Sequence, residues 1–150
     1  MSECRTCDLV KRRDEDGAPP WDRIRRTPNW DIVHAFGTST EGWIVLVVRR
    51  HITAVADMTA DEAAELGPLL KEVSRAVQAV TDCDKSYVVQ FGEHPDHPHV
   101  HVHVIPRARD LSPEHRGPGV FSLLGVPEDV AVSERRMNEI AQRLDAELRI

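Results

Sequence analysis

The order of the elements predicted from the sequence indicates an α+β fold with an antiparallel sheet of about five strands. Two main strands precede a long helical segment, two more follow it, and a second helix comes after an irregular segment near the end of the chain. No strand–helix–strand unit repeats, which disfavours a parallel sheet. The predicted fold therefore has a central helix after the second main strand and a C-terminal helix.

The first 48 residues are expected to contain an arm and two strands. Residues 1–20 are predicted to be irregular, because Lys11–Asp16 is a charge cluster that water solvates well and a Pro-Pro pair follows it. A short strand is predicted over Asp31–Ala35. The run Trp43–Val48 is almost continuously apolar and rich in β-branched residues, which is typical of a central strand.

A helix is predicted over residues 60–80. It begins with a capping box, Thr59-Ala60-Asp61-Glu62. Apolar side chains then recur at helical spacing, at Ala63, Leu66, Leu69, Leu70, Val73, Ala76, Val77 and Val80. Because proline lacks an amide hydrogen, Pro68 is expected to kink this helix or to shift its start.

The second half of the chain is predicted to contain two strands and the last helix. The strands are Tyr87–Phe91 and His99–Ile105, joined by a loop over residues 92–98. Residues 107–130 hold three prolines and three glycines, so they are expected to be mostly irregular. Ser133 can cap a final helix whose apolar face is formed by Met137, Ile140, Ala141, Leu144 and Leu148.

Length and composition limit the class of protein to which the chain can belong. A chain of 150 residues suits one domain, with 41% hydrophobic and 29% charged residues. The net charge of −6 argues against a nucleic acid polymer as partner. No stretch approaches 18 apolar residues and the first residues hold no apolar signal core, so we expect no membrane span and a cytoplasmic location.

The most informative segment is the alternating run His99-Val100-His101-Val102-His103. Alternate residues of a strand face opposite sides, so the valines are expected to enter the core while three imidazoles share the other face. Neighbouring imidazoles would then lie about 6.5–7 Å apart at Cα. Such a row can chelate a metal, or one imidazole can act as a nucleophile while its neighbours bind the anion that it attacks.

This run, continued by Val104-Ile105-Pro106-Arg107, resembles the signature of the histidine triad (HIT) nucleotide hydrolases and transferases. The resemblance covers residues 30–107 as the core of a single HIT-like domain spanning residues 1–150. Residues 1–20 form an N-terminal arm in this scheme, and residues 108–150 form a C-terminal extension. The resemblance implies a nucleotide substrate and a homodimer.

The resemblance also implies roles for individual residues. Neutral His101 would attack the α-phosphorus of a dinucleoside polyphosphate or nucleotide conjugate, giving a nucleotidyl-histidine intermediate. One ring nitrogen would be free to attack because the other donates its proton to a backbone carbonyl. His103, in its protonated form, would bind a phosphate oxygen, and Gln90 would contact the phosphate.

Several readings stay open at the level of the sequence. His97-Pro98-His99 resembles the related galactose-1-phosphate uridylyltransferases, in which register His99 would be the nucleophile. A metal hydrolase could instead use His99 and His101 as ligands. A third interpretation is a non-catalytic nucleotide-binding or zinc-stabilised interaction module, because the chain departs from the family pattern. Trp43 replaces a histidine, and Pro95–Pro98 replaces a segment whose hydroxyl binds phosphate. His94 or His97 could take over the role of that hydroxyl.

The pair Cys4-x-x-Cys7 has a spacing that lets two thiolates share one tetrahedral zinc. On its own this signal is weak. Many bacterial HIT proteins and the uridylyltransferases carry such a pair, and their zinc is completed by a histidine after the central strand and by the first histidine of the triad. The resemblance thus implies a structural zinc on Cys4, Cys7, His51 and His99, which would tether the arm. Cys83 is expected to be a plain buried thiol.

Other residues could contribute to a nucleotide site. Positive charge for a phosphate could come from four arginines, although solvated positions at strand ends are the simpler role for them: Arg49, Arg50, Arg107 and Arg109. Three aromatic residues could wall a base pocket, and core packing explains each equally well: Trp30, Phe36 and Trp43.

Overall fold

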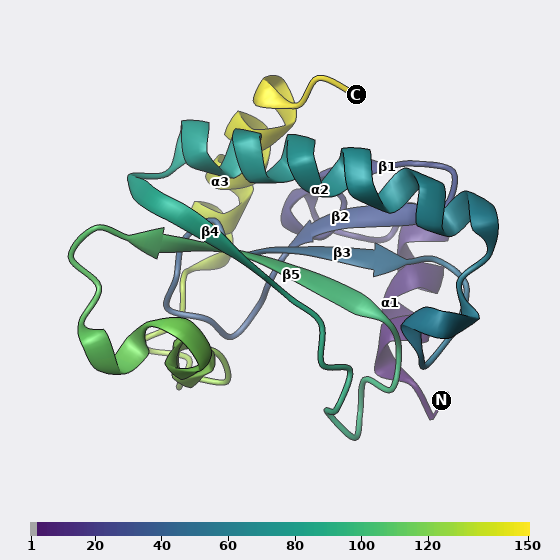
Figure 1. The fold of residues 1–150 in the computed structure, drawn as a ribbon, viewed down its shortest axis with the longest axis horizontal. Helices are drawn as coiled ribbons and strands as arrows, with labels where there is room; N and C mark the ends of the chain where they lie inside the picture. The colour runs from purple at the N-terminus through teal and green to yellow at the C-terminus, as the bar shows by residue number, and fades with distance from the viewer. Residues whose placement is uncertain (1–2) are drawn as a thin grey trace.

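The computed structural model describes residues 3–150 and confirms an α+β fold with a five-stranded antiparallel sheet (Figure 1). Neighbouring strands pair in the order β1-β2-β3-β5-β4. Their bounds are Arg25–Arg26 for β1, Trp30–His34 for β2, Ile44–Val48 for β3, Cys83–Val89 for β4 and His101–Ala108 for β5. The predicted central strand, β3, is buried along its whole length.

Two helices lie where the sequence predicts them. Helix α2 spans Ala60–Val80, and its capping box is formed: the Glu62 amide donates to the Thr59 hydroxyl at 3.1 Å, and the Thr59 amide donates to the Glu62 carboxylate at 2.8 Å. The helix begins at Ala60 and continues through Pro68, so the proline does not shift its start. Helix α3 spans Glu134–Glu147 and is capped by Ser133. Within residues 3–150, no helix has the length and apolar character that crossing a bilayer requires.

The sheet has two buried faces. Helices α2 and α3 cover one of them, over a core that includes Ile32, Leu46, Val100, Val102 and Val104. The opposite face carries a second cluster, made of Val10, Val33, Ala35, Trp43, Val45, Val47, Ile105 and Val120. The triad imidazoles belong to this second face, as the alternation predicts, but they are enclosed there: His99 and His103 are buried and His101 is partly buried.

The expectation of an irregular arm over residues 1–20 is wrong, because Arg5–Asp14 forms helix α1 and Pro20–Asp22 forms the short 3₁₀ helix η1. The charge cluster is not simply solvated. The Arg13 guanidinium is buried and pairs with Asp22 at 2.7 Å and with Asp31 at 3.2 Å. These partners are distant in sequence, so local composition could not reveal that α1 packs onto the sheet.

The strands around the triad also differ from their predicted bounds. Strand β4 starts at Cys83 and ends at Val89, because its first half pairs with the end of β5, whose last residue is Ala108. Strand β5 begins only at His101, so His99 precedes the strand. The extension is mostly 3₁₀ and loop: η3 is Pro113–His115, η4 is Gly117–Leu123, and an isolated bridge joins Thr38 to Leu124. Another 3₁₀ turn, η2 at Val55–Asp57, precedes α2.

Candidate functional site

Four side chains converge at the amino end of α1. Cys4 and Cys7 lie at the start of the helix, His51 follows β3, and His99 precedes β5. Their ligand atoms all lie within 4.8 Å of one another. The structure therefore assembles the four residues that the sequence assigns to a metal, from segments up to 95 positions apart.

The spacing of these atoms suits a tetrahedral ion. Tetrahedral zinc with ordinary bond lengths separates two nitrogens by about 3.3 Å and a nitrogen from a sulfur by about 3.6 Å. The two Nδ1 atoms of His51 and His99 are 3.3 Å apart, and Nδ1 of His99 lies 3.5 Å from the sulfur of Cys7 and 3.7 Å from that of Cys4. Only the 3.1 Å between Cys7 and His51 is shorter than this geometry. Two thiols and two imidazoles could thus hold one metal ion with a closed shell.

The two thiols of this cluster would need a nearby cation to ionise. Burial, followed by the neighbouring Cys4 thiol, raises the pKa of Cys7 to about 11. Thiolates form readily here only if a positive charge lies between them. Nδ1 of His99 is ready to accept such an ion, because its Nε2–H donates to the Val48 carbonyl at 2.6 Å. That hydrogen bond fixes the tautomer that leaves Nδ1 unprotonated.

His99 also orients the next imidazole of the triad. The backbone carbonyl of His99 accepts a hydrogen bond from Nδ1–H of His101 at 2.7 Å. A carbonyl can only accept, so Nδ1 carries the proton and Nε2 keeps its lone pair. Burial lowers the pKa of His101, which favours the neutral form. His101 is therefore held as a neutral imidazole with a free nitrogen.

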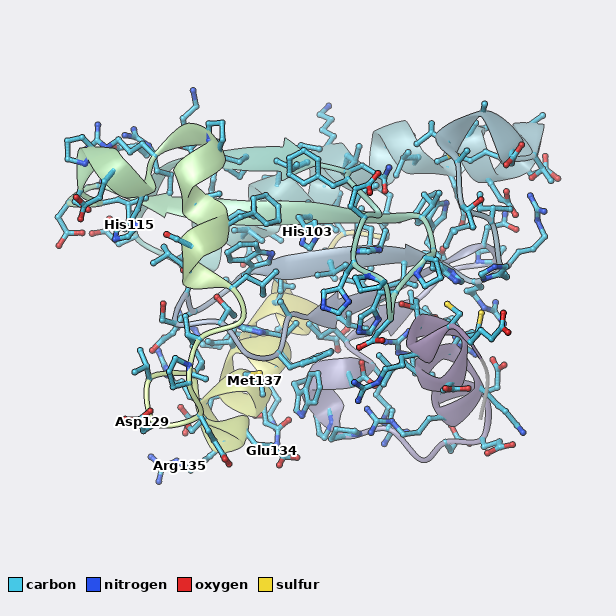
Figure 2. The ribbon with its side chains drawn as sticks, turned by 90° about the horizontal axis from the view of Figure 1, so that it is seen from below. His103, His115, Asp129, Glu134, Arg135 and Met137 are labelled. Atoms are coloured by element: carbon cyan, nitrogen blue, oxygen red, sulfur yellow. The ribbon has the colours of Figure 1, made fainter. Side chains whose placement is uncertain are left out.

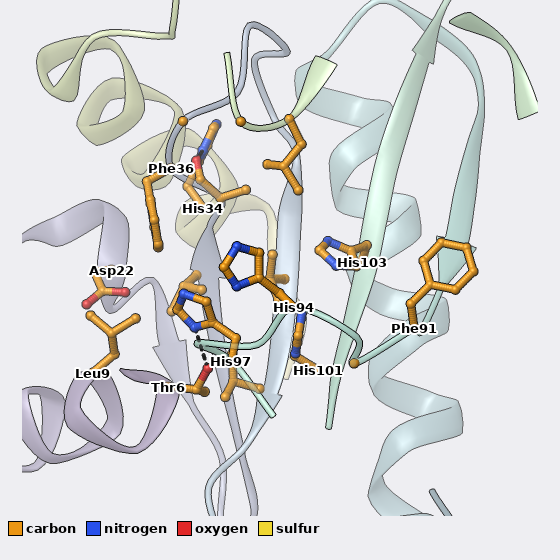
Figure 3. A pocket seen from close by; sticks show the side chains of 18 of the residues that line it. Thr6, Leu9, Asp22, His34, Phe36, Phe91, His94, His97, His101 and His103 are labelled. Atoms are coloured by element: carbon orange, nitrogen blue, oxygen red, sulfur yellow. Dashed lines mark hydrogen bonds between the residues drawn. The ribbon is translucent and has the colours of Figure 1, made fainter. Parts of the chain in front are cut away.

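His101 faces a cavity of about 550 Å³ on the second face of the sheet. Figure 3 shows the imidazoles of His94, His97, His101 and His103 gathered there, with Phe36 toward one side and Phe91 toward the other. The lining comes from α1, β2, β3, the loop after β4, β5 and η4. A cavity of this size suits a small molecule, and its walls are largely apolar.

His103 lies deeper than His101 and is held by aromatic groups. The indole Nε1–H of Trp43 donates to Nδ1 of His103 at 3.0 Å, and the ring of Phe121 lies 5.2 Å from the imidazole. Burial, and then the neighbouring His101, lowers the pKa of His103 to about 3. Burial in these surroundings opposes the charged form of His103, contrary to the protonated form that the resemblance implies. Figure 2 places His103 on the sheet face that η4 crosses.

The loop between β4 and β5 brings two further histidines to the cavity. His97 is hydrogen-bonded to the hydroxyl of Thr6 in α1 at 2.8 Å, and the rings of His94 and His97 are 5.3 Å apart. The Asp96 carbonyl accepts the backbone amide of Arg5 at 2.9 Å, which joins this loop to α1. His94 and His97 thus occupy a position from which either can contact a ligand, as the sequence predicts for a replaced segment.

The four arginines proposed as sources of positive charge do not line the cavity. Each instead pairs with a carboxylate elsewhere on the protein: Arg49 with Asp14, Arg50 with Glu62, Arg107 with Asp84, and Arg109 with Asp82 and Asp84. Their role as charges at strand ends is the one that the geometry supports. Arg13 is the single Lys or Arg among the described lining residues.

Of the remaining residues that the sequence proposes for the site, some line the cavity and others do not. Gln90 does not line the cavity, and its buried Oε1 has no hydrogen-bond partner among residues 3–150. Trp30 and Trp43 are fully buried core residues. Phe36 lines the cavity and is 49% exposed, so it alone of the three aromatic candidates could wall a base. Cys83 is buried and free, as expected.

Sequence reasoning missed several lining residues. Thr6 and Leu9 reach the cavity only because α1 is a helix, which the composition of the arm concealed. Asp22 is carried there by its pairing with Arg13. His34 is buried and its ring is already used, since its Nε2 accepts the Gly42 amide at 3.0 Å. The sequence could not show this, because an isolated histidine in an apolar strand can either bond the backbone or serve a binding site, and no local pattern distinguishes the two roles.

Comparison with known proteins matches the architecture and the triad. The family model described as HIT domain matches residues 22–110. A histidine triad (HIT) protein from Sinorhizobium meliloti superposes with a TM-score of 0.70 at 23% identity, over 92% of this chain and 94% of that one. A Hit-like protein from Bartonella henselae, described as involved in cell-cycle regulation, has a TM-score of 0.69 at 15% identity, over 93% and 95%.

A third solved structure bears on the metal. It is a Zn-bound histidine triad family protein from Mycobacterium smegmatis, with a TM-score of 0.60 at 21% identity, over 95% of this chain and 96% of that one. At these identities the likeness shows the fold alone. No curated protein sequence matches the chain.

Proposed function

The chain belongs to the HIT domain family, and from that premise we propose that it is a nucleotide hydrolase or nucleotidyl transferase acting at an α-phosphate. The observation that carries the proposal is the state of His101. Its Nδ1–H is held by the His99 carbonyl at 2.7 Å, and the imidazole lines a cavity that suits a nucleotide in size. A neutral imidazole with a free Nε2 is a competent nucleophile toward phosphorus.

The proposed reaction has two steps. Nε2 of His101 forms a bond to the α-phosphorus, and the bond from phosphorus to the leaving oxygen or nitrogen breaks, with its electron pair departing on the leaving group, which takes up a proton from water. Water or another acceptor then attacks the same phosphorus, loses its proton to solvent, and restores the imidazole. His103 would donate a hydrogen bond from Nε2 to a phosphoryl oxygen as charge develops there.

The charges around the cavity favour one class of substrate. The guanidinium of Arg13 is already paired with the buried carboxylates of Asp22 and Asp31, and the lining also holds the acidic side chain of Glu93. Four of the five histidines that line the cavity have lowered pKa values, chiefly through burial. A chain of several phosphates would find few positive partners among the described lining residues. We therefore favour a single-phosphate nucleotide conjugate, such as a nucleoside phosphoramidate, over a dinucleoside polyphosphate.

Turnover assays test both the proposed reaction and the preferred class of substrate. Purified protein is given a nucleoside phosphoramidate and, separately, a dinucleoside tetraphosphate with and without Mg²⁺, and release of nucleoside monophosphate is followed. We expect faster release from the phosphoramidate, and a peptide carrying nucleotidylated His101 when the reaction is quenched in alkali. Binding without any release would instead support the non-catalytic module, which the position of Gln90 outside the cavity favours.

We also propose that the metal at the Cys4, Cys7, His51 and His99 cluster is a structural zinc. The support is the chemistry of the ligands, since two thiols and two imidazoles suit zinc and fill its tetrahedral shell. A bound zinc would supply a fixed positive charge that orders α1 and His99. The metal-hydrolase reading has less support, because Nδ1 of His101 is hydrogen-bonded to a carbonyl and His101 lies outside the cluster.

The cytoplasmic location and the homodimer stay predictions. The cysteines of the cluster suit a reducing compartment, where thiols remain available to a metal.

A further inference from the structure

The imidazole of His103 has one polar partner among the described residues, and that partner is Trp43. The two side chains meet on the second face of the sheet, where Trp43 is fully buried and His103 is 6% exposed. The indole Nε1–H points at Nδ1 of His103 over 3.0 Å, with the rings nearly perpendicular at 84°. Phe121 packs edge-on against both rings, at 5.5 Å from the indole and 5.2 Å from the imidazole.

The chemistry of the indole decides the tautomer. A tryptophan side chain can donate one hydrogen bond and accept none, so Nδ1 of His103 must be the acceptor. The proton of the neutral imidazole is then on Nε2. The side chain lines the cavity, and no described residue is bonded to Nε2, so this N–H is available to a ligand.

The same contact opposes a second proton. Protonating Nδ1 would place two N–H donors face to face across 3.0 Å inside a buried aromatic environment. A bound phosphate would otherwise draw a proton onto the imidazole. The other titratable groups of the cavity are His101 on the same strand, His34 on β2, His94, His97 and Glu93 on the loop, and the Arg13–Asp22 pair; Trp43, just before β3, and Phe121 on η4 bring none.

We propose that Trp43 is a positioning residue that holds His103 as the neutral Nε2–H tautomer, so that a phosphoryl oxygen always meets one fixed, uncharged donor. The inference rests on the proposed function for the identity of the ligand, and on the geometry alone for the tautomer. Trp43 itself does not titrate, so it stays a donor at every pH at which the protein is folded.

The tautomer can be read directly by NMR of ¹⁵N-labelled histidine. In the wild-type protein we expect His103 to show a protonated Nε2 and an unprotonated Nδ1 between about pH 5 and 8, both free and with a nucleoside monophosphate bound. In Trp43→Phe, which keeps an aromatic ring and removes the donor, we expect Nδ1 to gain a proton in the complex and the His103 titration to move up by about one unit or more.

Phe121→Leu is the matched control, because it loosens packing against the same two rings and leaves the indole donor in place. It should keep the wild-type tautomer. A protonated Nδ1 in the wild-type protein, or a Trp43→Phe protein indistinguishable from wild type, would overturn the inference. If Trp43→Phe does not fold, the wild-type tautomer decides alone. If no nucleotide binds or turns over, the proposed function fails, and the tautomer of the free protein still decides this inference.

Discussion

Removing the two thiols of the metal cluster should strip the protein of zinc and lower its melting temperature. Cys4→Ser combined with Cys7→Ser leaves only two imidazoles, too few to close the shell. A ligand held at about a hundredfold above its Kd stabilises the folded state by about 2.7 kcal/mol. For a chain of this length each kcal/mol shifts the melting temperature by about 2–4 °C, so we expect a loss of about 5–10 °C.

The assay pairs metal analysis with thermal unfolding, with and without a chelator. Cys83→Ser is the control, because it makes the same substitution at a buried thiol in β4, outside the cluster. That variant should keep about one zinc per chain and its response to chelator. The reasoning is refuted if wild-type protein purified from zinc-supplemented cells contains no metal and its melting temperature ignores both chelator and added zinc.

Three further results are expected. His101→Asn should lower release of nucleoside monophosphate by about a thousandfold or more while nucleotide binding persists, and a rate within a factor of ten of wild type would exclude His101 as nucleophile. Arg13→Met removes the buried cation between Asp22 and Asp31, which then keep only the partly exposed Arg12 and Arg26, and it should cost up to about 3–5 kcal/mol in urea unfolding, whereas Arg12→Met, at a side chain 40% exposed, should cost clearly less. Phe36→Ala should weaken nucleotide binding by about tenfold if its ring stacks on the base; Val88→Ala, equally exposed on β4, should not, and equal effects would contradict the base wall.

The fold could be predicted from the sequence where local patterns match tertiary contacts. The capping box at Thr59 and the helical spacing after it describe α2 correctly, because both signals are contained within the helix. The alternation around His101 likewise fixes which side chains share a face. Helix α1 was not predicted, because the charged residues that suggest a solvated arm include Arg13, which is buried and pairs with two aspartates outside the helix.

The site was predictable to the extent that a motif encodes it. The residues of the metal cluster come together as the resemblance implies, although they lie in three separate segments. The surroundings of His103 were not predictable, since they depend on Trp43, 60 positions away, and on Phe121 of η4. A departure from a family pattern, such as Trp43, marks a position where a contact changes, but only the structure shows the new contact.

The position of His99 explains how a closed metal shell can influence chemistry that it does not touch. Its Nδ1 faces the cluster, its Nε2–H is tied to Val48, and its carbonyl holds the imidazole of His101. On the other side of the cluster, α1 carries Thr6, whose hydroxyl meets His97 in the cavity wall. An ion bound there would therefore fix two separate parts of the cavity, the segment that orients the proposed nucleophile and the helix that supports the opposite wall. Neither part is a regular strand of the sheet. A bound metal would therefore add a constraint to the hydrogen bonds that already join the short segment before β5 to Val48 and Ile52.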